Sequence, residues 1–224
     1  MRVASRCRTS AAERVGSLVL NAHSASTVTA LVLAGGRGSR MGGVDKGMQP
    51  FHGEPLALHV MRRIAPQADA LLISANRSIE DYERLGAAFG ARVIPDTRAD
   101  YPGPLAGIAA ALRAATTQYV LTAPCDAPFV DEHIGVTLMQ ALDAHGGDVA
   151  YAATIDASGQ VMAHPVFALL RTSLADDLDA WLDRGERKVR AWYARHKPVE
   201  VRFHDERAFY NINDLQQLAE LERR

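Results

Sequence analysis

A glycine-rich loop directly after a short apolar segment constrains this chain more than any other feature. The apolar segment spans residues 28–33, and the loop also carries the cations Arg37, Arg40 and Lys46. Its glycines are Gly35, Gly36, Gly38, Gly42, Gly43 and Gly47. Glycine lets a backbone fold closely around an anion with its N–H groups inward, and the cations supply the opposite charge. The loop therefore predicts a polyphosphate site at the end of a buried strand.

Two familiar phosphate-binding motifs do not match this loop. A dinucleotide fingerprint that starts at Gly36 requires a glycine at the position of Met41. A Walker A loop requires Gly-Lys-Ser/Thr, whereas here Lys46 follows Asp45 and precedes Gly47. A flexible turn between a strand and a helix is the alternative interpretation, but so many glycines combined with three cations are not typical of a linker.

The composition predicts an ordinary globular protein. The chain has 224 residues, of which 48% are hydrophobic and 23% charged, and this length suits one α/β domain. The net charge of -1 gives no general attraction to nucleic acid or to an anionic membrane. No apolar run approaches the roughly 18 residues of a membrane span. We therefore expect neither a nucleic-acid nor a membrane partner.

The two cysteines and the N-terminal residues complete the domain description. Cys7 and Cys125 cannot form a disulfide framework, so we expect a cytoplasmic protein, with Cys125 as a small buried residue rather than a nucleophile. Residues 1–27 are rich in Arg, Ser and Ala and read as a disordered extension. The sequence thus predicts an extension at 1–27 and one globular domain at 28–224.

Short apolar segments alternate with helical patterns along the domain. This alternation predicts βαβ units, and hence an α/β fold of the Rossmann-like, three-layer α/β/α type with a mainly parallel, mixed central sheet. A hairpin is expected around residues 156–159. The predicted strands are 29–33, 70–74, 92–94, 119–123, 149–153, 165–169 and 199–203. The predicted helices are 55–64, 78–89, 104–115, 131–144, 174–182, 188–195 and 214–221.

Polar side chains follow the predicted parallel strands. Ser74, Asp96 and Asp126 lie at or just past the ends of three strands, and the glycine loop follows a fourth. Ligands of such sheets bind at the carboxyl ends of the strands, so these residues are expected to converge. Mg²⁺ prefers one or two carboxylates with phosphate oxygens and water, which favours Asp126 as a metal ligand over a plain turn residue.

Three motifs together resemble molybdenum cofactor guanylyltransferases, a branch of the nucleotidyltransferases with a glycosyltransferase-A-like fold. The first is L-A-G-G-R at residues 33–37 with R-M-G-G-V-D-K-G at 40–47. The second is D-x-x-x-D-Y-P-G-P-L-A-G at 96–107, and the third is C-D-x-P at 125–128. Weaker matches occur at 185–189 and 209–213, so the similarity spans roughly residues 29–221.

The resemblance implies roles for individual residues. Lys46, Arg40 and Asp126 would be catalytic, and Asp126 would also hold Mg²⁺. The implied nucleotide-binding residues are Leu33, Ala34, Gly35, Gly36, Lys46, Ser74, Asp96 and Asp126. The family usually has Asn where Ser74 stands, so the choice of base is less secure here, and Asn76 is a candidate to share that role.

The acceptor side carries a second departure from the family pattern. Lys188 stands where the family usually has Arg, which replaces a bidentate phosphate contact by a point charge. Asn211 and Asn213 alternate on a strand-like segment and point the same way. Pterin binding, completion of the metal shell and ordinary turns before a helix all remain open for this pair. For His164, a structural hydrogen bond is preferred to contact with the acceptor.

The implied activity is transfer of GMP from GTP to the phosphate of molybdopterin, with release of pyrophosphate. Related alternatives are a CTP-dependent enzyme on the same pterin and an enzyme that uses a sugar phosphate. A non-catalytic GTP-binding carrier and a plain interaction module are the alternatives of a different class. GTP, molybdopterin and apo-molybdoenzymes are the expected partners, and a monomer or weak oligomer is expected.

Overall fold

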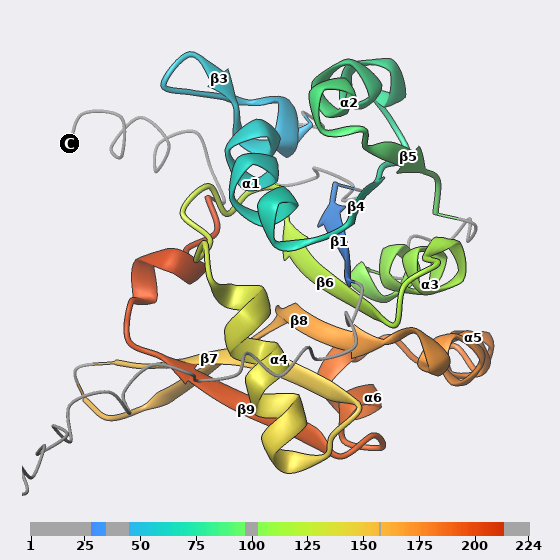
Figure 1. The fold of residues 1–224 in the computed structure, drawn as a ribbon, viewed down its shortest axis with the longest axis vertical. Helices are drawn as coiled ribbons and strands as arrows, with labels where there is room; N and C mark the ends of the chain where they lie inside the picture. The colour runs from blue at the N-terminus through green and yellow to red at the C-terminus, as the bar shows by residue number, and fades with distance from the viewer. Residues whose placement is uncertain (1–27, 35–44, 97–102, 157, 213–224) are drawn as a thin grey trace, which may run out of the picture.

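A seven-stranded sheet forms the centre of the molecule (Figure 1). The computed structural model describes residues 28–34, 45–96, 103–156 and 158–212. The strand order is β5-β4-β1-β6-β8-β7-β9. Every neighbouring pair is parallel except the two that involve β8, which confirms the predicted mainly parallel, mixed sheet. The strands are β1 (Val28–Leu33), β4 (Ala70–Ser74), β5 (Arg92–Ile94), β6 (Tyr119–Pro124), β7 (Val149–Ile155), β8 (Val161–Arg171) and β9 (Pro198–Phe203).

Helices cover both faces of this sheet. Successive side chains of β1 explain why, because Ala30 and Val32 join one buried cluster while Leu31 joins the other. The first cluster receives α1 (Leu56–Ile64), α2 (Ile79–Gly86) and α4 (Ile134–His145). The second receives α3 (Pro104–Ala114), α5 (Ala175–Asp183) and α6 (Val189–Tyr193). The predicted three-layer α/β/α architecture is therefore confirmed.

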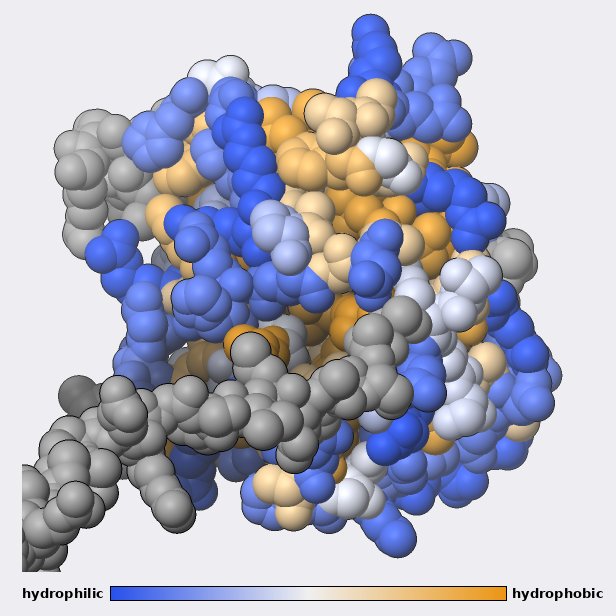
Figure 2. Space-filling view, in the orientation of Figure 1, coloured by the Kyte–Doolittle hydropathy of each residue, from blue (hydrophilic) through white to orange (hydrophobic). Residues whose placement is uncertain are grey.

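Short elements connect the layers. A two-stranded ribbon pairs β2 (Pro50–Phe51) with β3 (Glu54–Pro55) ahead of α1. The 3₁₀ helices are η2 (Lys46–Met48), η3 (Ala65–Gln67), η4 (Ala87–Phe89), η5 (Thr172–Leu174) and η6 (Glu206–Phe209). On the face seen in Figure 2, hydrophobic residues gather at the centre and hydrophilic residues surround them. In the described residues, no helix has the length and apolar character that crossing a membrane requires.

The hairpin of β7 and β8 is longer than the sequence predicts. Strand β8 starts at Val161, whereas the apolar run from Pro165 predicted a later start. The pairing with β7 shifts between Ala168 and His164, so Pro165 lies where no ladder hydrogen bond to β7 is needed. A strand tolerates proline at such a bulge, and for this reason it continues through Pro165.

The start of α2 differs from the prediction in its chemistry. Ser78 precedes the helix as expected, but its side chain makes no capping hydrogen bond and its φ is 49°. The backbone carbonyl of Ser78 instead accepts from the N–H groups of Asp81 and Tyr82. The predicted helix at 214–221 and the N-terminal extension lie outside the described residues.

Helix α3 approaches the sheet through a glycine. A Cβ atom at Gly107 would lie 2.6 Å from Ser74 Oγ and 2.7 Å from Leu33 Cδ2. Both atoms belong to the carboxyl ends of neighbouring strands, because Leu33 pairs with Ser74 in the sheet. Gly107 therefore sets how closely α3 packs against the edge of the sheet where ligands are expected.

Replacing Gly107 by Ala should lower the free energy of unfolding by about 1–3 kcal/mol, because the added methyl overpacks this contact. In an unobstructed helix the same change would raise stability by about 1 kcal/mol, so the sign is diagnostic. Urea denaturation measures the difference. Ala110→Gly in the same helix, at a position that is only partly buried, is the control and reports mainly the change in helix propensity. A Gly107→Ala protein more stable than the wild type would contradict this packing.

Candidate active site

Four parallel strands end at the same level, which brings their following loops together. In the sheet register Leu33 pairs with both Ser74 and Pro124, and Ser74 pairs with Ile94. Backbone hydrogen bonds continue past these ends: Ala34 N–H donates to Ser74 O (2.8 Å), and Cys125 N–H donates to Leu33 O (3.0 Å). The segments that carry the candidate residues therefore leave the sheet side by side.

Lys46 and Asp126 meet at this edge. Lys46 begins η2, Asp126 follows β6, and Lys46 Nζ donates to Asp126 Oδ2 at 3.2 Å. The side chain of Lys46 is 23% exposed and that of Asp126 is 12% exposed. Both side chains are thus largely buried, yet each remains accessible to a ligand. A cation and a carboxylate that bind one ligand together need this combination.

The environment of Asp126 makes its charge costly. Burial raises the pKa of the Asp126 carboxyl above its ordinary value, and the Lys46 ammonium opposes part of that rise. Desolvation is the larger effect, so the neighbouring cation does not fully compensate for the loss of water. An additional cation near Asp126 would stabilise the ionised carboxylate.

Cys125 lies directly before Asp126 and is a packing residue, as the sequence predicts. It is 7% exposed and not part of a disulfide. Burial raises the pKa of the Cys125 thiol, with the nearby Asp126 carboxylate as the next cause. A protonated, enclosed thiol is a poor nucleophile, so no covalent step through Cys125 is expected.

The segment after η6 reaches the same site from the end of the described chain. Ile212 N–H donates to Asp126 O at 2.9 Å, which brings the backbone that follows Asn211 to the metal-ligand candidate. Asn211 is half-buried and lies in irregular backbone rather than in the strand-like segment that was predicted. Its predicted companion Asn213 lies outside the described residues.

The other predicted nucleotide residues are placed as follows. Ser74 is 1% exposed and packed beside Gly107. Asp96 follows β5, and its backbone N–H donates to Asn76 Oδ1 at 2.7 Å, which joins the loops after β4 and β5. Leu33 and Ala34 form the end of β1 and the first residue after it. Gly35, Gly36 and Arg40 lie outside the described residues.

Lys188 is not brought to the Lys46–Asp126 pair. It is exposed and precedes α6, on the face of the sheet opposite α1, α2 and α4. Among described residues it forms no ion pair with Asp126. His164 has the structural role that was preferred: its Nε2 lies 2.8 Å from Thr154 Oγ1, and its ring stacks on Phe209 with centroids 5.0 Å apart.

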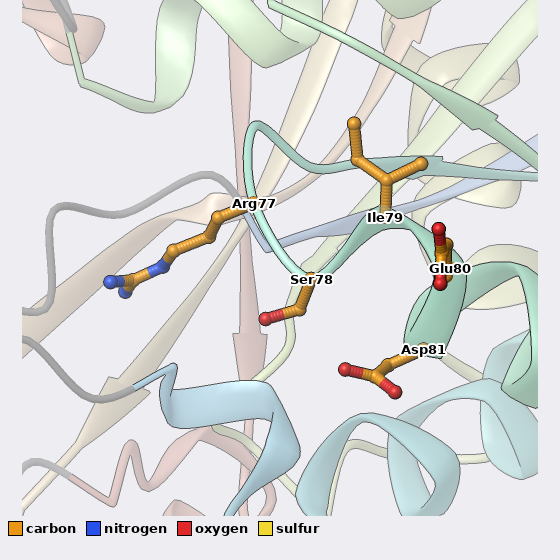
Figure 3. Close-up of a pocket in the computed structure, with 5 residues that line it drawn as sticks. All are labelled: Arg77, Ser78, Ile79, Glu80 and Asp81. Carbon is orange, nitrogen blue, oxygen red and sulfur yellow. The ribbon is translucent and has the colours of Figure 1, made fainter.

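A hollow of about 360 Å³ adjoins the site at the start of α2 (Figure 3). Figure 3 shows Arg77, Ser78 and Asp81 projecting to one side, whereas Ile79 points away from them. Arg77 Nε also lies 3.7 Å from Asp45 Oδ2. Asp45 also accepts a hydrogen bond from the Tyr82 hydroxyl at 2.7 Å. Neither contact is predictable from the sequence, because residues 45, 77 and 82 share no motif.

The fold and the site define a nucleotidyltransferase-like α/β protein, and comparisons with known proteins make this specific. Residues 30–199 match the model of the MobA-like NTP transferase domain. The chain belongs to this family.

Relatives from bacteria carry one functional name. A Burkholderia vietnamiensis protein named molybdenum cofactor guanylyltransferase is 58% identical over 198 residues, which cover 88% of this chain and 97% of that protein. A protein of the same name from Cupriavidus necator is 47% identical over 197 residues, with the same coverage of 88% and 97%.

Solved structures share the fold of this chain. The molybdopterin-guanine dinucleotide biosynthesis protein A of Archaeoglobus fulgidus superposes with a TM-score of 0.69 at 26% identity, over 87% of this chain and 97% of that one. The 4-diphosphocytidyl-2C-methyl-D-erythritol synthase of Anaerococcus prevotii has a TM-score of 0.66 at 13% identity, over 88% and 97%, and shares the fold.

Asp126→Asn should stabilise the ligand-free protein at neutral pH. A raised pKa means that the folded state binds this proton more tightly than the unfolded chain does, so the wild type loses stability as pH rises through that pKa. The amide variant avoids this loss. Thermal unfolding from about pH 4 to about pH 8 should therefore show an advantage of the variant that grows with pH.

Asp143→Asn, on the exposed surface of α4, is the matched control and should show no such pH-dependent difference. A variant at residue 126 that is less stable than the wild type at the higher pH would contradict the desolvation of this carboxyl.

Proposed function

We propose that this protein transfers GMP from GTP to the phosphate of molybdopterin and releases pyrophosphate, giving a guanine dinucleotide form of the cofactor. The observation that carries the proposal is the pair at the strand ends, with Lys46 from the glycine-rich loop after β1 and Asp126 from the end of β6. The names of the relatives support the choice of GTP and of the pterin acceptor. A cytoplasmic site of action and delivery of the product to apo-molybdoenzymes belong to the same proposal.

Charge compensation is the main contribution of Lys46 and Arg40. A triphosphate brings several negative charges to the edge of the sheet, and Lys46 can exchange its contact with Asp126 for one with a phosphate oxygen. Backbone N–H groups of residues 34–38 would hold further oxygens, as glycine-rich loops do in other phosphate sites. Arg40 would add a planar guanidinium with several donors.

Asp126 fits the proposed Mg²⁺. Only its Oδ2 is bonded to Lys46, and its burial favours a cation that offsets the desolvated charge. Mg²⁺ commonly binds one or two carboxylates with phosphate oxygens and waters. The described residues hold no cluster of three or more His, Cys, Asp or Glu side chains suited to a metal, so the substrate would complete the ligand set. When bound, the ion would neutralise charge on the triphosphate.

The reaction is an in-line displacement at the α-phosphorus. An oxygen of the pterin phosphate forms the new P–O bond, and the bond to the β-phosphate oxygen breaks with pyrophosphate as the leaving group. The acceptor phosphate is already an anion at neutral pH, so no side chain has to remove a proton. Positioning and charge neutralisation then account for catalysis.

The remaining predicted residues would orient the two substrates. Asp96 and Ser74 would contact the nucleotide together with the end of β1, and Asn211 would contact the acceptor from its position next to Asp126. Lys188 and Asn213 would serve the acceptor phosphate and pterin. Of these, Lys188 stands apart, because α6 lies on the face of the sheet opposite α1, α2 and α4.

A pyrophosphate-release assay with molybdopterin and Mg²⁺ should show turnover with GTP that exceeds turnover with CTP or ATP by at least about tenfold. Base selection by hydrogen-bonding groups commonly gives large ratios, because the wrong base leaves polar groups unpaired. Equal or faster turnover with CTP would replace the guanylyl assignment by the cytidylyl alternative. Nucleotide binding without pyrophosphate release would indicate a carrier instead of an enzyme.

Lys46→Ala and Asp126→Ala should each lower kcat/KM for GTP by about 10²–10³, the usual cost of removing one electrostatic contact to a developing charge. Steady-state kinetics at saturating Mg²⁺ measure the loss. Lys197→Ala and Asp143→Ala remove exposed residues of the same types and should leave kcat/KM unchanged. Wild-type kinetics in Asp126→Ala would overturn its role.

A further inference from the structure

A buried carboxylate joins the turn that carries Lys46 to two other parts of the fold. Asp45 is 9% exposed, and its Oδ1 accepts from Gly47 N–H at 3.2 Å and from the Tyr82 hydroxyl at 2.7 Å. Its Oδ2 lies 3.7 Å from Arg77 Nε. Gly47 belongs to η2, Tyr82 to α2, and Arg77 to the loop after β4. The carboxylate therefore links η2 to α2 and to the loop after β4.

Tyr82 is well suited to support Asp45. Its side chain is fully buried in the core between the sheet and α1, α2 and α4. Burial raises the pKa of the Tyr82 phenol, so the hydroxyl keeps its proton and donates it to the carboxylate. A tyrosine has few rotatable bonds, and a ring enclosed in a core cannot follow a moving partner. The position of the Asp45 carboxylate is therefore set by the core of the domain.

Gly47 brings the same turn into contact with the segment of Asp126. A Cβ atom at Gly47 would lie 2.3 Å from the Tyr82 hydroxyl oxygen and 3.2 Å from both Cβ and Sγ of Cys125. The absence of a side chain at Gly47 thus allows Tyr82, η2 and Cys125 to pack together. Since Lys46 precedes Gly47 and Asp126 follows Cys125, this packing sets the two reactive side chains opposite each other.

We propose that Asp45 is a positioning residue, supported by the Tyr82 hydroxyl, which holds the Lys46 ammonium opposite Asp126 so that both meet one triphosphate. The inference rests on the proposed function and deepens it. Asp45 acts through Lys46 and does not touch the substrate. A lysine side chain is flexible, and fixing its backbone reduces the conformational freedom that is lost when the ammonium binds a phosphate.

A double-mutant cycle tests whether the network works through Lys46. Tyr82→Phe removes one hydroxyl and keeps the ring in the core, and it should lower kcat/KM for GTP about tenfold, the scale of one hydrogen bond to a charged group. In the Lys46→Ala background the same change should cost less than about twofold, because the group that the network positions is gone.

The affinity for Mg²⁺·GTP without acceptor, measured by titration calorimetry across the same four proteins, gives a readout that does not depend on transfer. A wild type that binds Mg²⁺·GTP but releases no pyrophosphate would contradict the proposed function, and the affinity cycle would still decide the positioning role. Multiplicative losses of Tyr82→Phe and Lys46→Ala in both measurements would overturn the inference, because they would show that Tyr82 supports the fold without acting through Lys46.

Two further variants separate positioning from stability. Tyr151→Phe removes a comparable hydroxyl, which donates to Glu200 at 3.1 Å between β7 and β9, and should leave the kinetics for GTP unchanged. Asp45→Asn keeps an oxygen that can accept from Gly47 and Tyr82 and should retain more of kcat/KM than Asp45→Ala. Should Tyr82→Phe fail to fold, the cycle is run with Asp45→Ala, which removes the same hydrogen bond from the carboxylate side. Equal losses in Asp45→Asn and Asp45→Ala would overturn the hydrogen-bonding role.

Discussion

The contact between Lys46 and Asp126 is the interaction on which the account of this protein depends. It joins the glycine-rich loop after β1 to the end of the neighbouring strand β6, across 80 positions of the sequence. The sheet makes this contact possible, because parallel strands in register deliver their following residues to one edge. A cation and a carboxylate at that edge are what a metal–triphosphate complex requires from a protein.

The pair is held in a state that favours ligand binding over maximal stability. A largely desolvated carboxylate next to one ammonium gains less from the ion pair than it loses with its water, and its raised pKa reflects this difference. A second cation at Asp126, together with a phosphate at Lys46, would compensate both charges at once. Before a ligand binds, the surrounding core, through Tyr82 and Asp45, limits how far the Lys46 ammonium can move.

The fold could be predicted from the sequence because its signals are local. Alternation of apolar segments with helical patterns places the strands and helices within a few residues, and glycine and proline mark their ends. The convergence of Lys46 and Asp126 also follows from strand order. Side-chain partners such as Tyr82 and Asp45 could not be predicted, since a hydrogen bond over 37 positions leaves no pattern. Strand β8 begins before Pro165 because a bulge accommodates the proline, and local propensity does not reveal such a bulge.

A crystal structure with Mg²⁺ and a non-hydrolysable GTP analogue tests the central claim most directly. The account predicts one triphosphate that contacts the Lys46 ammonium while its metal ion is bound by the Asp126 carboxylate, with the guanine over the loops that follow β4 and β5. A nucleotide whose phosphates lie away from the edge formed by β1 and β6, with Lys46 and Asp126 still paired to each other, would contradict it.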